Sequence, residues 1–173
     1  DVVGAPYPDL VVRRASDGKA FVIPTGGLLG FDKTRVTPDV WAGRDLVIGS
    51  PDLTGDGIGD LVARTADTGR AVVRPGTADG YGSGIRPTDA LAGRDLVTAS
   101  GDLNGDGDND LVARKAESGM ANVYLGGGNG SLNRRGTTTD VSSYNLLAGA
   151  GDVDSDGNVD LVARDDSGRL WLL

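Results

Sequence analysis

The chain has 173 residues and a formal net charge of −8, and 29 of its residues are glycine. Glycine is costly inside helices, which argues against a helical bundle, and no apolar run approaches the ~20 residues that cross a bilayer. Cysteine and histidine are absent, so zinc sites of the Cys/His type and a Ser-His-Asp triad are excluded. The acidic balance argues against nucleic acid as a partner, because nucleic-acid binding needs a basic surface.

One short sequence recurs along the chain at a fixed interval. Asp-Leu-Val-Ala-Arg begins at Asp60, Asp110 and Asp160, and a fourth copy, Asp-Leu-Val-Val-Arg, begins at Asp9. The copies lie 51, 50 and 50 residues apart. Such an interval indicates a repeat architecture. We predict one repeat region whose units cover approximately residues 1–51, 52–101, 102–151 and, as a partial unit, 152–173.

The second unit shows the elements expected of each repeat. Short apolar strands are predicted at residues 45–49, 60–65 and 70–74, with a looser fourth strand at 85–90. Short strands separated by Gly, Pro, Asp and Asn are typical of an all-β fold. A glycine with positive φ is expected in the turn between the second and third strands. This glycine recurs at Gly18, Gly69, Gly119 and Gly168.

Four short strands in each unit of this length are the pattern of a β-propeller blade. We therefore predict an all-β chain of about four antiparallel blades, with three, four, four and three strands. A β-sandwich is the alternative, but a sandwich has no reason to repeat at a fixed interval. The strand count leaves three arrangements open: part of a larger ring, a small ring with two incomplete blades, or an assembly of several chains.

An aspartate-rich loop of nine residues joins the first and second strands in the units at 52–60, 102–110 and 152–160. Oxygen-bearing side chains stand at positions 1, 3, 5 and 9 of each loop, and a glycine at position 6 permits a sharp bend. Calcium takes 6–8 oxygen ligands, and a backbone carbonyl at position 7 would add one to the side chains. The predicted ligands are Asp52, Thr54, Asp56, Ile58, Asp60, Asp102, Asn104, Asp106, Asp108, Asp110, Asp152, Asp154, Asp156, Asn158 and Asp160.

The register shared by the three loops predicts about three calcium ions for the chain. Ordinary Asp/Asn/Gly turns are the alternative, but they have no reason to repeat one register three times. An EF-hand is excluded, because it needs a glutamate at loop position 12, where this chain has alanine. The loop at 1–9 keeps carboxylates only at Asp1 and Asp9, and we predict no calcium there.

The segment Gly101-Asp-Leu-Asn-Gly-Asp-Gly-Asp-Asn-Asp-Leu-Val112 resembles the FG-GAP/VCBS repeat, which also builds the propellers of integrin α-subunits. The resemblance implies calcium in the loops that join strands one and two. It also implies that ligands bind on the opposite rim of the propeller. Trp41, Arg44, Arg94 and Tyr144 are the candidate ligand-binding residues on that rim, with packing between blades as the alternative for the two aromatic residues.

These observations favour a secreted, calcium-binding β-propeller module that binds a partner or mediates adhesion and is not catalytic by itself. A carbohydrate-binding, lectin-like appendage of a secreted hydrolase is one alternative, and a glycan-active enzyme domain is the other. The expected partner is a protein or a glycan on the rim opposite the calcium loops. Self-association is a further expectation, because an unclosed ring leaves strand edges exposed.

Overall fold

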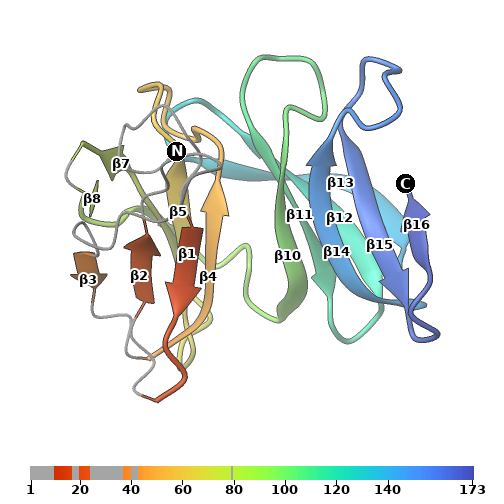
Figure 1. Cartoon of the computed structure of the whole chain (residues 1–173), viewed down its shortest axis with the longest axis horizontal. Helices are drawn as coiled ribbons and strands as arrows, with labels where there is room; N and C mark the ends of the chain where they lie inside the picture. Colours follow the sequence, from red (N-terminus) through yellow and green to blue (C-terminus); the bar gives the residue numbers. More distant parts are fainter. Residues whose placement is uncertain (1–9, 17–19, 24–36, 40–42, 79) are drawn as a thin grey trace.

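The computed structural model describes residues 10–16, 20–23, 37–39, 43–78 and 80–173. This part of the chain is all-β, as predicted, and it contains no helix that could cross a membrane. Figure 1 shows its strands gathered into consecutive sheets along the chain. Sequence neighbours pair as antiparallel strands within each sheet, so every sheet is a simple meander.

The first blade contains β1 (Leu10–Arg13), β2 (Ala20–Ile23) and β3 (Thr37–Asp39). The second blade contains β4 (Arg44–Ser50), β5 (Asp60–Thr65), β6 (Ala71–Arg74) and β9 (Ile85–Thr88). The third blade contains β10 (Arg94–Gly101), β11 (Asp110–Lys115), β12 (Met120–Gly126) and β13 (Leu132–Asp140). The fourth blade contains β14 (Tyr144–Gly151), β15 (Asp160–Asp165) and β16 (Leu170–Leu172).

The predicted series of three, four, four and three strands is therefore confirmed. A small ribbon of β7 (Gly76–Thr77) and β8 (Gly80–Tyr81) was not predicted, because each strand has only two residues. The turn glycines Gly69, Gly119 and Gly168 adopt φ of 66°, 71° and 84°, as expected. The equivalent Gly18 lies outside the described residues.

The blades stand side by side with their first strands adjacent, so that β10 lies between β4 and β14 (Figure 1). We call the face of a blade that meets the preceding blade its front, and the opposite face its back. Successive residues of a strand point to opposite faces, so Leu111 packs toward the second blade and Val112 toward the fourth. Both are buried, which explains why the Leu-Val-Ala run is continuously apolar rather than alternating.

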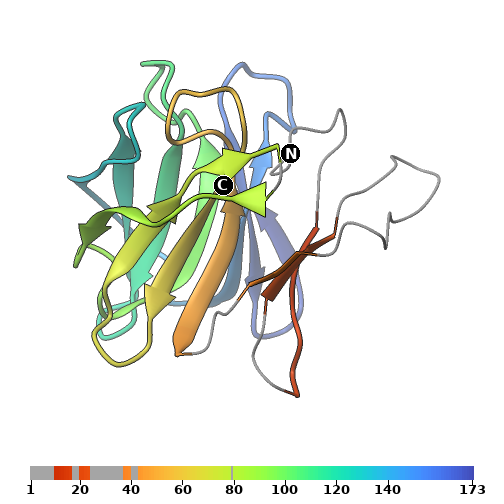
Figure 2. The same ribbon diagram turned by 90° about the vertical axis from the view of Figure 1, so that its left-hand side faces the viewer.

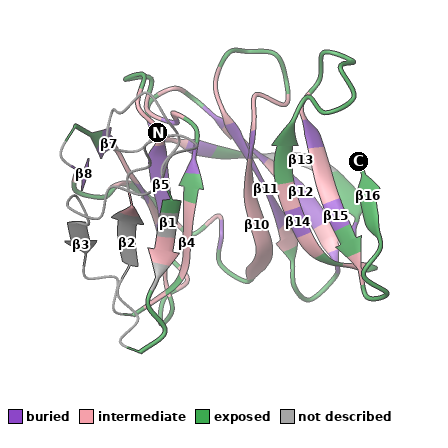
Figure 3. Cartoon of the chain, in the orientation of Figure 1, coloured by how far each residue is buried: buried purple, intermediate pink, exposed green. Residues whose placement is uncertain are grey.

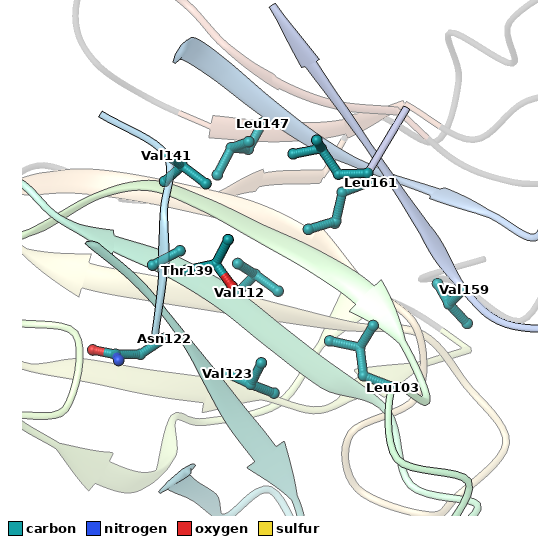
Figure 4. Close-up of a pocket in the computed structure, with 11 residues that line it drawn as sticks. Leu103, Val112, Asn122, Val123, Thr139, Val141, Leu147, Val159 and Leu161 are labelled. Atoms are coloured by element: carbon teal, nitrogen blue, oxygen red, sulfur yellow. The ribbon is translucent and has the colours of Figure 1, made fainter. Parts of the chain in front are cut away.

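The two well-described blade interfaces are filled differently. Between the second and third blades, Tyr124 is 0% exposed and packs in one cluster with Leu132 from β13. Between the third and fourth blades there is an apolar cavity of about 290 Å³ (Figure 4). At the position of Tyr124, the fourth blade carries Leu173, which lines this cavity. The described chain gives that blade no fourth strand to supply an equivalent of Leu132.

Candidate metal-binding loops

The three aspartate-rich loops lie along one edge of the molecule, where each first strand turns into the second (Figure 2). They connect β4 to β5, β10 to β11 and β14 to β15. The turns that contain Gly69, Gly119 and Gly168 lie at the other ends of β5, β11 and β15. The structure therefore separates the candidate metal loops from the turns by the length of a strand.

The first aspartate of each loop gathers backbone N–H groups around its carboxylate. Asp52 accepts three of them, from Thr54, Gly55 and Gly57, at N···O distances of 2.9, 2.7 and 2.7 Å. Asp102 accepts the three equivalent N–H groups of the next loop over 3.2, 2.7 and 2.8 Å. These bonds bend each loop around a point, which is the arrangement that an enclosed cation requires.

Two residues in each loop adopt positive φ to make this bend. The glycine at position 6 has φ of 85° at Gly57 and 92° at Gly107, as its residue type predicts. Position 4 has the same requirement, with φ of 81° at Gly55 and 64° at Ser155. The sequence interpretation missed position 4, although glycine occupies it in two of the three loops.

The last aspartate of each loop ties the loop to the core. Asp60 is fully buried and accepts the N–H of Leu53 at 2.7 Å through one oxygen and that of Gly76 at 2.9 Å through the other. Asp110 repeats this arrangement in the third blade, with distances of 2.8 and 2.9 Å. Leu53 is 1% exposed and belongs to the core cluster, so the loop conformation is coupled to the packing of the blades.

The electrostatic environments of the first and last aspartates differ. Burial raises the pKa of Asp60 and Asp110, and the charges of neighbouring loop aspartates raise it further. At Asp102, the N–H of Gly107 is the largest influence and the pKa is lowered. Burial opposes ionisation at Asp52, but the backbone N–H donors of its loop outweigh burial and lower the pKa. A bound cation would reverse the shift at the last aspartate, because it offsets both burial and repulsion.

Two of the loops bring three carboxylates together. One oxygen each from Asp52, Asp56 and Asp60 lies within 4.8 Å of the other two. In the last loop the same separation holds for the carboxylates at positions 1, 3 and 5, which are Asp152, Asp154 and Asp156. Asp160 is not part of this second set, and it accepts the N–H of Val153 at 2.7 Å.

The middle loop is arranged differently. Within the described residues, no three acidic side chains of the loop at 102–110 meet the same separation. Its position 3 is Asn104, whose Nδ2 donates to Asp106 Oδ2 at 2.8 Å. The Asp108 carboxylate lies close to Gly128 in the hairpin of the same blade. The acidic side chains of this loop therefore converge less closely than those of the loops at 52–60 and 152–160.

Position 7 behaves alike in all three loops. The N–H groups of Ile58, Asp108 and Asn158 each donate to the carboxylate at position 5, at 2.9, 2.9 and 2.8 Å. The side chain at this position varies while its backbone contact stays the same. Metal binding through the position 7 carbonyl stays a prediction. The absence of calcium from the loop at 1–9 also stays a prediction, because that loop lies outside the described residues.

The predicted rim residues mostly contact other protein groups. The Arg94 guanidinium lies over the Tyr124 ring, 5.9 Å from its centroid, and Tyr144 packs against the core cluster between the third and fourth blades. Arg44 donates to the Thr65 hydroxyl. Trp41 lies outside the described residues. Packing accounts for the placement of Arg94 and Tyr144, and ligand binding at this rim stays a prediction.

In the second and third blades, the arginine that ends the Asp-Leu-Val-Ala-Arg copy makes contacts between blades that the sequence did not indicate. Arg64 and Arg114 make ion pairs with Asp45 and Asp95 at N···O distances of 2.8 and 2.7 Å, within their own blades. Each guanidinium also donates to backbone carbonyls at the start of the following blade. The 50-residue spacing of these arginines was visible in the sequence, but their reach into the next blade was not.

Residues 102–163 match the family model of the FG-GAP-like repeat. The match begins at the first aspartate of the middle loop, runs through the last loop and ends in β15. It thus covers two of the three candidate metal-binding loops. No curated protein matches the chain. The resemblance noted at residues 101–112 is confirmed, and the chain contains an FG-GAP-like repeat.

Proposed function

We propose that this FG-GAP-like repeat chain is a calcium-binding module in which each of the three aspartate-rich loops holds one calcium ion. The observation that carries the proposal is the convergence of Asp52, Asp56 and Asp60, and of Asp152, Asp154 and Asp156, to within 4.8 Å. Carboxylates held this close repel one another unless a cation lies between them. The shared register extends the proposal to the middle loop.

Calcium suits these loops better than magnesium does. Its 6–8 oxygen ligands can be a mixture of carboxylates, amides, backbone carbonyls and water at flexible geometry. The loops offer this mixture, because position 3 is Thr54 in one loop, Asn104 in the next and Asp154 in the third. Magnesium demands near-ideal octahedral geometry and gives up its waters reluctantly.

In the proposed mechanism, calcium acts through the fold rather than at a reacting group. An ion held at positions 1, 5 and 9 fixes the loop that joins the first two strands of a blade. The aspartate at position 9 also holds the N–H of Leu53, whose side chain lies in the core between two blades. Binding of calcium would therefore stabilise the packing of blades as well as the loop itself.

We propose an extracellular setting, where calcium is abundant and modules bind it with dissociation constants of about 0.1–1 mM. At ten times the dissociation constant, one site adds about 1.4 kcal/mol to the free energy of unfolding. The rigid blades would then present the edge opposite the metal loops to a protein or glycan partner. In this proposal the module is not catalytic by itself, since its carboxylates serve as metal ligands.

The test is calcium stoichiometry measured by native mass spectrometry and titration calorimetry. We expect about three ions, a melting temperature that falls in EDTA, and recovery with calcium to a greater extent than with magnesium. The variants Asp56→Ala, Asp106→Ala and Asp156→Ala should each lose one ion. Asp67→Ala, an exposed aspartate in the turn after β5, is the matched control and should lose none.

Unchanged melting in EDTA would count against the proposal for all three loops. Stoichiometry of two, with Asp106→Ala leaving the count unchanged, would restrict it to the two loops whose carboxylates converge.

A further inference from the structure

The aspartate-rich loops of the second and third blades touch each other directly. Asn109, at position 8 of the loop at 102–110, donates through Nδ2 to the backbone carbonyl oxygen of Asp52 at 2.7 Å. Asp52 is the first residue of the loop at 52–60 and supplies one of its three converging carboxylates. A single hydrogen bond therefore joins the end of one proposed calcium site to the start of the other.

The hairpin between β12 and β13 makes a second connection, and it reaches toward the loop at 52–60 in Figure 1. The N–H of Gly126, where this hairpin begins, donates to Oδ1 of Asp110, the last residue of the middle loop, at 2.9 Å. At the other end of the hairpin, the N–H of Gly130 donates to the carbonyl oxygen of Leu53 at 2.8 Å. Each of the two loops thus holds one end of the hairpin.

The hairpin fits closely between the two loops. Gly128 lies between Asp108 of the middle loop and Gly55 of the other loop. A Cβ added to Gly128 would lie 2.6 Å from Asp108 Oδ1, and a Cβ added to Gly55 would lie 2.7 Å from the carbonyl oxygen of Gly128. Because close-packed groups transmit displacements, a shift of either loop would press the hairpin against the other.

An ion in either loop would fix the atoms that make these contacts. In the middle loop, Asn109 stands between position 7, whose carbonyl is a predicted ligand, and Asp110, so bound calcium would hold its side chain in place. In the other loop, bound calcium would fix Asp52 and with it the carbonyl that accepts the hydrogen bond. The middle of each loop is exposed, whereas β5 and β11, which follow the loops, begin with buried residues (Figure 3). Calcium could therefore reach both loops from solvent without disturbing the contact between them.

We propose that the loops at 52–60 and 102–110 bind calcium cooperatively, so that an ion in one loop raises the affinity of the other, and that Asn109 carries this coupling. The inference rests on the calcium binding proposed above. The first ion would order the contact between the loops, and the second would then bind a loop that is already in place. Such coupling is reciprocal and typically changes affinity by about 5–150-fold. We expect about fivefold, because the contact consists of one side-chain hydrogen bond and one hairpin.

Charge acts in the opposite direction. The middle loop has four aspartates and the loop at 52–60 has three, and an ion in one loop lowers the negative potential that attracts calcium to the other. Salt screens this effect, because the Debye length falls from about 10 Å at 0.1 M to about 3 Å at 1 M ionic strength. Measurement in about 0.5 M potassium chloride therefore reduces the effect of charge and retains the coupling through contact.

The last loop shows which residue can replace Asn109 in a loop of this kind. Val159 stands at position 8 there, and the loop at 152–160 still brings three carboxylates within 4.8 Å of one another. A valine side chain donates no hydrogen bond. Asn109→Val should therefore remove the hydrogen bond to Asp52 and leave the middle loop able to bind its own ion.

The test is calcium titration of the full chain with Asp156→Ala, which leaves the two loops in question. Calorimetry gives the affinities for both ions, and adding Asp56→Ala or Asp106→Ala gives the affinity of each loop alone. The product of the two affinities in the two-loop chain should exceed the product of the single-loop affinities about fivefold. Adding Asn109→Val should reduce this factor to about one and leave the single-loop affinities unchanged. Asn133→Val, exposed on β13 of the same blade, is the matched control and should keep the factor.

Hydrogen exchange of the Gly130 amide is a second measurement, and it needs no change at Asn109. In the chain with Asp106→Ala and Asp156→Ala, only the loop at 52–60 retains its ligands. Calcium should nevertheless slow the exchange of this third-blade amide about fivefold, because its hydrogen bond ends on Leu53.

A factor of one in the two-loop chain would overturn the proposal. A factor that Asn109→Val leaves unchanged, or Gly130 exchange that calcium does not slow, would overturn it as well. Two ions bound without coupling would leave the proposed calcium binding intact, whereas a chain that binds no calcium would refute that function itself. The two failures are therefore distinguishable.

Discussion

The guanidinium of Arg114 reaches out of the third blade and donates through Nη1 to the backbone carbonyl of Tyr144, 2.6 Å away at the start of the fourth blade. The same side chain holds Asp95 at 2.7 Å within its own blade. One residue thus connects β11, β10 and the first residue of β14. Because the connection recurs at Arg64, it is a regular device by which each interior blade fixes the position of the next.

Removing this connection should destabilise the protein measurably. Arg114→Met keeps much of the apolar stem but loses the hydrogen bonds to Tyr144 and Asp95. Hydrogen bonds that involve a charged group contribute about 1.5–3 kcal/mol, so we expect the free energy of unfolding to fall by about 2 kcal/mol. Chemical denaturation monitored by circular dichroism measures the change.

Arg70→Met is the control for this substitution. Arg70 makes an ion pair with Asp89 at 3.2 Å between two exposed side chains. Such pairs contribute about 0.2–1 kcal/mol, so the control should cost less than 1 kcal/mol. Equal losses in the two variants would show that Arg114 contributes no more than a surface charge.

Calcium stabilisation should weaken as the pH falls. Burial raises the pKa of Asp60 and Asp110 in the metal-free protein, so the folded state takes up protons at these groups more readily than the unfolded chain does. Without calcium, these two groups therefore favour folding less as the pH rises above their ordinary range. Each proposed calcium ion needs the last aspartate of its own loop ionised, and its affinity should fall by up to about tenfold per pH unit for each proton that it displaces.

The measurement is the difference in melting temperature between calcium and EDTA, recorded from pH 7 down to pH 4.5. We expect this difference to shrink steadily over that range. A difference that stays constant would show that the buried aspartates are not ligands, because protonation would then not compete with the metal.

The sequence predicted the strands and the bend of the aspartate-rich loops well, because both are local features; that the loops bind calcium stays a proposal. The strand at Asp60–Thr65 follows from a short apolar run bounded by turn residues, and the positive φ of Gly57 and Gly69 follows from residue type and position. The contacts between blades are not local. Nothing near Arg64 in the sequence indicates that its partners include Leu91 and Arg94, 27 and 30 residues away.

The candidate ligand rim shows the same limit. Arg94 and Tyr144 occupy equivalent places near the start of a blade, and both polar and aromatic character suggested contact with a ligand. In the structure, the Arg94 guanidinium lies over the Tyr124 ring of the same blade, and Tyr144 packs against the core cluster between the third and fourth blades. Which neighbour a rim residue meets depends on how strands from different parts of the chain are brought together, and local sequence patterns do not reveal this.

Substitutions at position 4 of the aspartate-rich loops should separate two costs, the strain of a side chain at positive φ and the steric clash of its Cβ with neighbouring atoms. Gly105 has φ of 77°, and a Cβ added there would meet no atom within 4 Å, so Gly105→Ser tests the backbone conformation alone. A non-glycine residue at positive φ costs about 1–2 kcal/mol, so we expect this variant to lose about 1 kcal/mol. Gly55→Ser should lose more, because its Cβ would lie 2.7 Å from the carbonyl oxygen of Gly128.

The reverse change provides the matched comparison. Ser155 already stands at φ of 64° in the third loop, and Ser155→Gly should relieve the strain and raise the free energy of unfolding in calcium by about 0.5–1 kcal/mol. Denaturation of the three variants in parallel measures the differences. Equal destabilisation by Gly105→Ser and Gly55→Ser would show that the second and third blades do not approach as closely at Gly55 and Gly128 as the structure has it.

The cavity between the third and fourth blades predicts opposite effects of one substitution at two equivalent positions. Ala121 lines the cavity of about 290 Å³, so the two methyl groups added by Ala121→Val have room to pack against apolar neighbours such as Leu147. Cavity filling typically adds about 0.5–2 kcal/mol to the free energy of unfolding, and we expect a gain of about 1 kcal/mol.

Ala71 holds the same register on β6, but it is 0% exposed in an interface that Tyr124 and Leu132 already fill. Overpacking costs about 1–3 kcal/mol, so Ala71→Val should destabilise. Thermal and chemical denaturation of both variants measures the signs, and destabilisation by Ala121→Val would show that these two blades pack as closely as the second and third.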